Sequence, residues 1–316
     1  FDLTTFPEYG KLSGRTVQMA EDAVSRIDES AGKRNRGDFC LWKFSKPGEP
    51  SWPVDIGEGR PGWHIEDTAI TEKYFGPQYE IHGGGQDLMF PHHEAEIAQQ
   101  ESASGLKPFV RFWLHAGFIV QKREKMSKSR GVFLTAEEAL KEYSPEALRF
   151  YFLSAHYRSS LDYTENNLKQ AEAAVMRIAE FRNNIAFFPP QSQNKEIDKW
   201  PSVLKLTERI TEAMDDDFNT PEAIAVLFGL IKEVNQIIAD RKLDYALVNE
   251  MRKTIDFLYN IFGIIPPKWD YSQLPDEIKK LVDQRQEARE QKGFGKADKL
   301  REKIKNLGYE VNDTIY

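Results

Sequence analysis

The sequence predicts an α/β domain followed by an all-helical region. Within its 316 residues, short apolar runs mixed with glycine fill residues 61–135, and helix caps with 3.6-residue apolar spacing follow them. A hydrophobic content of 40% excludes global disorder. A chain of this length can bury roughly 75% of its unfolded surface, so its cores need no covalent reinforcement.

The first region alternates strand and helix signals. Turn residues crowd its opening 60 positions, where we expect one helix over Arg15–Ser30. Phe39–Phe44 is typical of a strand. Tyr79–His82 is expected to be a buried strand that runs into Gly83–Gly85, and a helix is expected after it over His92–Ser102. This is α/β patterning.

The second region carries repeated helix-start signals. Thr135 with Glu138 forms a capping box, and Ser144–Pro145 places proline at a first helical position. A third helix begins at Thr164, with the apolar stripe Leu168, Ala171, Val175, Ile178 and Ile185. A polar linker follows, and the further helical segments are Thr220–Ala239, Asp244–Phe262 and the charged tail Pro275–Leu307. We therefore expect residues 136–307 to be helical throughout.

Composition excludes several classes of protein. The longest apolar runs, such as Ile261–Ile265, are far shorter than the roughly 20 residues of a membrane span. No secretory signal is evident, and Cys40 is the only cysteine, so we expect a reducing, cytoplasmic setting. The net charge of -7 argues against a general nucleic-acid coat protein but not against a local basic face. Because the first residue is Phe1 within a loop-like segment, we expect the chain to begin inside a larger protein.

The segment Lys125-Met126-Ser127-Lys128-Ser129 places two lysines in a loop before a helix. Ammonium groups there can bind a triphosphate and stabilise charge developing on a departing pyrophosphate. The alternative is a solvated basic loop.

Glycines follow the predicted strand in His82-Gly83-Gly84-Gly85-Gln86-Asp87. They allow a ligand to approach the backbone at a strand end, where open α/β sheets bind ligands. Asp87 is then placed to accept hydrogen bonds from a ribose, and His82 to lie against a substrate or its adenylate. The alternative is a simple turn.

His92 and Glu96 stand four residues apart and share a helix face, a spacing that can hold one zinc ion. The alternative is an ordinary helix start, and we expect His93 to point elsewhere. Further upstream, Trp63 can wall a small pocket and Asp67 can be a third metal ligand. Their alternative is a core tryptophan and a helix cap.

The lysine pentapeptide is the signature loop of class I aminoacyl-tRNA synthetases. Together with the three other segments, it makes the chain resemble the cysteinyl-tRNA synthetase family over essentially its whole length. The similarity extends to Tyr9–Gly14, Glu146–Tyr151, Ala213–Pro221 and the tail Arg285–Arg301.

This resemblance implies an organisation. Residues 1–165 would be the second half of a class I nucleotide-binding, Rossmann-like domain with part of its insertion. Residues 166–265 would be a helical-bundle tRNA-binding domain, and residues 266–316 a charged anticodon-binding segment. The family's His-x-Gly-His signature does not occur here. We therefore expect the first half of the nucleotide fold to be absent from this chain, and to be a partner if it is separately encoded or cleaved.

The resemblance also implies an activity. Cysteine would be activated by ATP with Mg²⁺ and transferred to tRNA(Cys), with no membrane partner. Lys125 and Lys128 would be catalytic. The other implied roles are ATP binding by His82, Gly83, Gly85, Asp87 and Lys128, substrate contact by Trp63, Thr68 and His82, and one Zn²⁺ held by Asp67, His92 and Glu96. The best-known members have cysteine at the position of Asp67. A carboxylate is a harder ligand than a thiolate, so we expect weakened zinc binding.

Two other functions stay open. A ligase that joins cysteine to an amino sugar uses the same fold, but such relatives lack a long anticodon-binding segment. A non-catalytic tRNA-binding paralogue is the other alternative, and the intact lysine loop argues against it.

Overall fold

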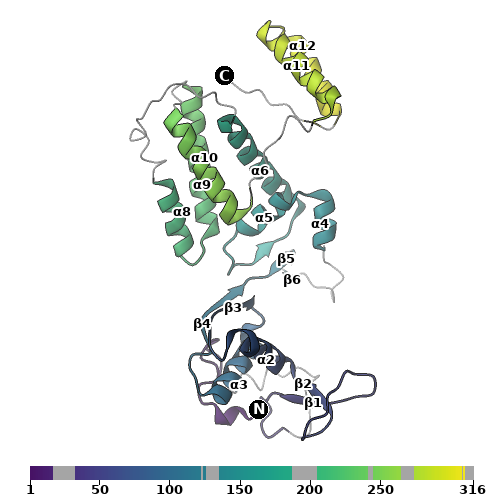
Figure 1. Ribbon diagram of the computed structural model, residues 1–316, viewed down its shortest axis with the longest axis vertical. Coiled ribbons are helices and arrows are strands. Elements are labelled where there is room, and N and C mark those ends of the chain that lie inside the picture. Colours follow the sequence, from purple (N-terminus) through teal and green to yellow (C-terminus); the bar gives the residue numbers. More distant parts are fainter. Residues whose placement is uncertain are drawn as a thin grey trace. The chain divides into compact units, whose positions relative to one another are not determined.

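The computed structural model describes residues 1–16, 33–121, 124–125, 135–186, 205–240, 245–264, 274–307 and 309. The chain divides into two compact units (Figure 1). Phe1–Gly131 and Tyr157–Asp162 form an α/β unit, and Val132–His156 and Tyr163–Tyr316 form a helical unit. The predicted fold class, α/β followed by a helical bundle, is confirmed.

The α/β unit is built around a strand–helix–strand connection. Parallel strands β3 and β4 pair from Tyr79 opposite Val110 to Gly85 opposite Ala116, and helix α3 joins them. Parallel strands need such a crossover, which explains the α/β pattern of the sequence. The elements of this unit are η1 Leu3–Thr5, β1 Trp42–Phe44, β2 Gly59–Pro61, α2 Trp63–Phe75, β3 Tyr79–Gly85, η2 Met89–His93, α3 Glu94–Ser104, β4 Val110–Ala116, β5 Ile119–Gln121, β6 Glu124–Lys125 and β7 Leu161–Asp162.

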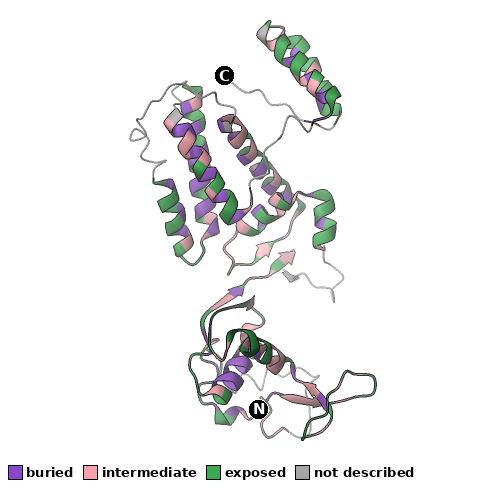
Figure 2. Ribbon diagram, in the orientation of Figure 1, coloured by how far each residue is buried: buried purple, intermediate pink, exposed green. Residues whose placement is uncertain are grey.

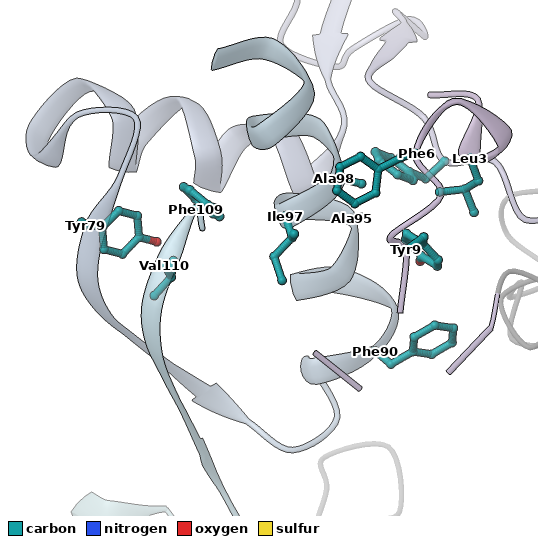
Figure 3. Packing of buried hydrophobic residues seen from close by; sticks show 11 residues of the cluster. Leu3, Phe6, Tyr9, Tyr79, Phe90, Ala95, Ile97, Ala98, Phe109 and Val110 are labelled. Carbon is teal, nitrogen blue, oxygen red and sulfur yellow. The ribbon is translucent and has the colours of Figure 1, made fainter. Parts of the chain in front are cut away.

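Helix α3 runs through the core of this unit, and every residue from Glu94 to Glu101 is buried. Figure 3 shows apolar side chains of the N-terminal segment and of the β3–β4 strands around it. The cluster comprises Leu3, Phe6, Tyr9, Phe39, Tyr79, Phe90, Ala95, Ile97, Ala98, Phe109 and Val110. A helix buried on all sides must also pair its buried carboxylates, and that requirement shapes the segment opposite it.

Two of the three buried carboxylates of α3 hold the segment that follows Tyr9. Glu94 accepts hydrogen bonds from the backbone N–H groups of Gly10, Leu12 and Ser13, at 3.1, 2.9 and 2.6 Å. Glu101 pairs with the Lys11 ammonium at 2.5 Å. The conformation of the segment therefore depends on α3 as well as on its own turn residues, Gly10 and Gly14, which have positive φ.

The helical unit follows the predicted caps. Thr135 and Glu138 complete the capping box of α4, and the Ser144 hydroxyl accepts from the Ala147 N–H at the start of α5. The helices are α4 Ala136–Glu142, α5 Pro145–Leu153, α6 Glu165–Ala186, α8 Leu206–Asp215, α9 Thr220–Ala239, α10 Tyr245–Phe262, α11 Asp276–Glu290 and α12 Phe294–Asn306.

Buried residues form one stripe along several of these helices (Figure 2). The stripe predicted for α6 is buried at all five positions, from Leu168 to Ile185. Helix α9 begins at Thr220 and ends at Ala239, as predicted. The local periodicity of apolar residues therefore predicts the helices and buried faces of this unit.

Three predictions differ from the structure or fall outside it. Residues 136–307 are not helical throughout, because Leu161–Asp162 forms β7 and pairs in parallel with β5. The strand predicted over Phe39–Phe44 is shorter, Trp42–Phe44. The helix expected over Arg15–Ser30 and the linker Pro189–Lys199 fall mainly or wholly outside the described residues.

The charged tail is helical but not one helix. Helices α11 and α12 lie side by side (Figure 1) and bury Leu281 and Ala288 with Ile304. The chain reverses at Lys292, which has a φ of +59°, and the Gly293 N–H bonds to the Ala288 carbonyl at 2.7 Å. Burying the apolar stripes of two short helices against each other explains the reversal.

The described helices were also compared with the dimensions of a bilayer. None of them is both long enough and apolar enough to span it.

Candidate functional site

The predicted site residues of the α/β unit meet where β3 ends and α3 begins. His82 lies on β3, His92 on η2 and Glu96 on α3. Asp67 and Trp63 come from α2. The carboxyl ends of parallel strands are where open α/β sheets place their ligands, so this convergence follows from the topology.

Asp67, His92 and Glu96 offer possible ligand atoms that lie within 4.8 Å of one another. His92 Nε2 lies 2.7 Å from Asp67 Oδ2 and 3.0 Å from Glu96 Oε1. The four-residue spacing is not that of a regular α-helix here, because His92 belongs to the π turn and Glu96 to α3. The two side chains still face each other across that junction.

Aromatic rings fix the orientation of His92. Trp63 stacks on it, with ring centroids 4.3 Å apart, and the exposed fraction of Trp63 is 55%. His92 Nδ1 lies 2.6 Å from His64 Nδ1. A histidine with one nitrogen held by a neighbour presents the other nitrogen in a fixed direction, a common arrangement for a metal ligand. His64 is a site residue that sequence reasoning missed.

This cluster places one histidine between two carboxylates, so its own residues do not neutralise each other. Burial raises the pKa of Glu96, although His92 opposes that shift. Burial lowers the pKa of His92, but the hydrogen bonds and charges of Glu96 and Asp67 have a larger opposite effect, so the net pKa is raised. Both Glu96 oxygens are buried, and neither accepts a hydrogen bond of good geometry from the described residues. A divalent cation would satisfy this orphaned carboxylate, so the residues present fit a metal.

A second group of donors lies beside the first. His82, His93 and Glu96 also offer ligand atoms within 4.8 Å of one another. Burial, with a smaller effect of His82, lowers the pKa of His93 to about 3, so its imidazole is neutral near pH 7. The expectation that His93 points elsewhere is wrong, because its ring lies within reach of His82 and Glu96. The adjacent pair His92-His93 between a strand and a helix was the available signal.

The glycines of β3 differ in how much space the structure leaves for a side chain. A Cβ at Gly84 would meet the His93 ring at 2.7 Å, and one at Gly85 would meet Asp87 Oδ1 at 2.6 Å. A Cβ at Gly83 would lie at an ordinary van der Waals distance, 3.7 Å, from the Leu114 carbonyl. The closest packing thus falls on Gly84 and Gly85, while Gly83 and Asp87 are exposed.

Thr68 is 2% exposed and faces α3. Its hydroxyl accepts a hydrogen bond from Gln99 Nε2 at 2.7 Å, and the same amide donates to the His64 carbonyl at 2.6 Å. These bonds fix α2 against α3. The substrate contact that the resemblance implies for Thr68 stays a prediction.

The lysine loop is described only at its start. Lys125 closes the short strand β6, which pairs with β5. Lys128 lies outside the described residues. The catalytic roles of both lysines stay predictions.

Known protein families match almost the full length of the chain. A model of the class I (C) tRNA synthetase catalytic domain matches residues 1–173. A DALR domain model matches residues 209–266, and a cysteinyl-tRNA ligase anticodon binding domain model matches residues 272–314.

Curated relatives agree with these models. A cysteine–tRNA ligase of Thermococcus onnurineus is 41% identical over 99% of this chain and 68% of its own length. One of Legionella pneumophila is 42% identical over 99% of this chain and 66% of its own length. The chain thus spans about two thirds of the length of these relatives.

Among solved structures, the fold resembles the ternary complex of Agrobacterium radiobacter K84 LeuRS with tRNA and LeuAMS. The TM-score is 0.53 at 13% identity, over 67% of this chain and 32% of that one. At this identity the likeness concerns the fold alone.

Proposed function

Because the chain belongs to the cysteine–tRNA ligase family, we propose that it forms the larger part of an enzyme that activates cysteine with ATP and transfers it to tRNA(Cys). One observation carries the proposal. Within the catalytic-domain match, Asp67, His92 and Glu96 converge on one point beside the end of β3. That is the place where a small amino acid and a nucleotide can be held together.

In this proposal each group has a defined task. Trp63 and His82 bound the amino-acid pocket, and Thr68 keeps α2 in position. Gly83, Gly85 and Asp87 hold the adenosine at the end of β3. Lys125 and Lys128 stabilise the charge that develops on pyrophosphate as the cysteine carboxylate attacks the α-phosphate, with Mg²⁺ accompanying ATP.

The chemistry of the donor set favours Zn²⁺ on Asp67, His92 and Glu96. Zinc at that position would bind the substrate thiolate, which a serine hydroxyl cannot imitate well at neutral pH. Two neighbouring side chains would orient His92 as a ligand. His64 holds its second ring nitrogen, and Trp63 stacks on the His92 ring.

The helical part of the proposal concerns tRNA. Residues 166–265 form the tRNA-binding bundle and residues 266–316 the anticodon-binding segment, with residues 1–165 catalytic. The anticodon-binding match over residues 272–314 favours this function over a cysteine:amino-sugar ligase. The lone cysteine, Cys40, is consistent with a cytoplasmic enzyme.

The decisive test is cysteine-dependent exchange of pyrophosphate into ATP. We expect none from residues 1–316 alone, because the first half of the nucleotide pocket is then missing. Exchange should appear when the N-terminal third of the Legionella pneumophila relative is joined to the chain, and serine should not replace cysteine. Exchange by residues 1–316 alone would contradict the incomplete-pocket model. Binding of tRNA without exchange by the joined protein would favour a non-catalytic paralogue.

A further inference from the structure

We propose that Arg158 binds the phosphates of ATP at the edge of the sheet where β3 and β4 end. The inference rests on the proposed function, because it adds a cation to the nucleotide subsite of that reaction. It goes beyond the lysine loop, since Arg158 lies on a different segment of the chain.

Arg158 belongs to a short segment that the chain inserts into the α/β unit. Residues 132–156 and 163–316 belong to the helical unit, whereas Tyr157–Asp162 belongs to the α/β unit. The segment ends in β7, which pairs in parallel with β5. This brief return therefore places its few side chains, Arg158 among them, against the α/β unit.

Two hydrogen bonds hold this segment at the carboxyl ends of β3 and β4. The side-chain amide of Gln86, directly after β3, donates to the Arg158 carbonyl at 2.6 Å. The N–H of Gly117, directly after β4, donates to the Tyr157 carbonyl at 2.7 Å. Open α/β sheets bind their ligands at this edge, so the segment borders the place proposed for the nucleotide.

The absence of a side chain at Gly117 allows the segment to approach. A Cβ at Gly117 would lie 2.2 Å from the Ser159 carbonyl oxygen and 2.5 Å from its carbonyl carbon. Both are backbone atoms, so a side chain at residue 117 would have to displace the segment. Main-chain packing therefore fixes the position of Arg158, and an alanine at Gly117 disturbs that position without removing the guanidinium.

The guanidinium of Arg158 is exposed and lies near this edge. Its central carbon is 5.3 Å from the centroid of the Tyr157 ring, which is a cation–π distance. Burial lowers the pKa of His115, and the charge of Arg158 lowers it further. His115 is the last residue but one of β4. The positive charge of Arg158 therefore acts at the carboxyl end of that strand.

An arginine at this position complements a nucleotide. Gly85 and Asp87 are proposed to hold the adenosine, and Gln86, which binds the Arg158 carbonyl, stands between them in the sequence. A planar guanidinium forms paired hydrogen bonds with phosphate oxygens. Lys125 lies on β6, and β5 separates β6 from β7 in the sheet. The triphosphate would then have cations on both sides of β5.

The test compares ATP with adenosine, because only ATP carries phosphates. The protein is the chain joined to the N-terminal third of the Legionella pneumophila relative. Isothermal titration calorimetry measures its affinity for a non-hydrolysable ATP analogue and for adenosine. The variants are Arg158→Ala, Arg158→Lys and Gly117→Ala. Arg111→Ala is the matched control, since Arg111 is an exposed arginine at the opposite, amino end of β4.

We expect Arg158→Ala to weaken binding of the ATP analogue by about 10–100-fold, as loss of a charge-assisted hydrogen bond does, and to leave the affinity for adenosine unchanged. Arg158→Lys should give a smaller loss, because it keeps the charge but not the paired hydrogen bonds. Gly117→Ala should also weaken binding of the analogue, and Arg111→Ala should change neither affinity. Circular dichroism verifies that each variant is folded.

Several results would overturn the inference. An unchanged affinity of Arg158→Ala for the analogue would make Arg158 an ordinary surface arginine, and equal losses for the analogue and adenosine would make its role structural. A raised KM for tRNA with an unchanged affinity for the analogue would assign the guanidinium to a tRNA phosphate. Absence of analogue binding by the joined protein without substitutions would also reject the phosphate subsite.

Cysteine-dependent exchange of pyrophosphate separates this inference from the proposed function. Exchange by the joined protein, together with an unchanged affinity of Arg158→Ala for the analogue, would support the function and reject the inference. A loss confined to the phosphate-bearing ligand, in a joined protein that shows no exchange, would support the inference and reject the function.

Discussion

The α/β unit and the helical unit bury different chemistry. Among the described residues, ten of the thirteen buried polar side chains lie in the α/β unit, and only Thr220, Thr254 and Arg285 lie in the helical one. The α/β unit buries four of its charged or histidine donors around one short helix start, whereas the helical unit buries mainly Leu, Ile, Val and Ala. A buried polar group is costly unless it is paired, so the core of the α/β unit depends on polar partners as well as on apolar packing, whereas the core of the helical unit depends mainly on apolar packing.

The largest expected effect tests whether the chemistry belongs to the α/β unit alone. In the chain joined to the N-terminal third of the Legionella pneumophila relative, Lys128→Ala should slow single-turnover adenylation by 10²–10³-fold, about 3–4 kcal/mol of transition-state stabilisation. Binding of cysteine without ATP should barely change. Lys73→Ala, at an exposed position of α2, is the matched control. A slowing of less than about threefold would mean that the loop is only a solvated surface loop.

A second substitution tests the apolar core of the helical unit. Leu258 on α10 is fully buried, so Leu258→Ala should lower the free energy of unfolding by about 2–5 kcal/mol through lost burial and a cavity. Ile261 on the same helix is 43% exposed, and Ile261→Ala should change the free energy of unfolding by only about 0.5 kcal/mol. Urea unfolding followed by far-ultraviolet circular dichroism measures both. Equal effects of the two variants would refute the assigned packing of α10.

The polar core of the α/β unit should respond to a much subtler change. Glu94→Gln keeps the size of the side chain but removes the charge that holds three backbone N–H groups. We expect the free energy of unfolding to fall by about 1–3 kcal/mol, because a buried backbone N–H is then left facing the N–H group of the new amide. Tryptophan emission during urea unfolding reports it, since four of the six tryptophans lie in this unit: Trp42, Trp52, Trp63 and Trp113. Glu137→Gln on α4, where the carboxylate is exposed, should leave the free energy of unfolding unchanged. An unchanged free energy of unfolding in Glu94→Gln would refute the assigned role of the polar core.

The smallest expected effect concerns the tail. Deletion of residues 276–316 should raise the KM for tRNA and leave adenylation intact. The exposed cations Lys292, Lys296, Lys299, Arg301, Lys303 and Lys305 are the candidate phosphate ligands. For every phosphate that the shortened chain no longer neutralises, the dependence of log affinity on log salt should flatten by about 0.7–0.9. Unchanged tRNA kinetics and salt dependence would remove the tail from the interface and leave these cations as ordinary surface charges.

The helical unit could be predicted in detail because its signals are local. The Thr135–Glu138 box and the limits of α9 each depend on residues within one or two helical turns. The prediction failed at Leu161–Asp162, where a short strand pairs with β5. That pairing has no strong local signal, because the partner strand lies in another part of the chain.

The sequence by itself determined the fold class, the apolar stripes and most of the residue types of the site. It placed His92 and Glu96 together because their spacing is local, and the family resemblance added Asp67. Only the tertiary structure decided that His82, His93 and His64 meet them, and that Glu96 lies between two histidine groups. The reason is physical: the parallel register of β3 and β4 and the burial of α3 bring together side chains that no periodicity connects.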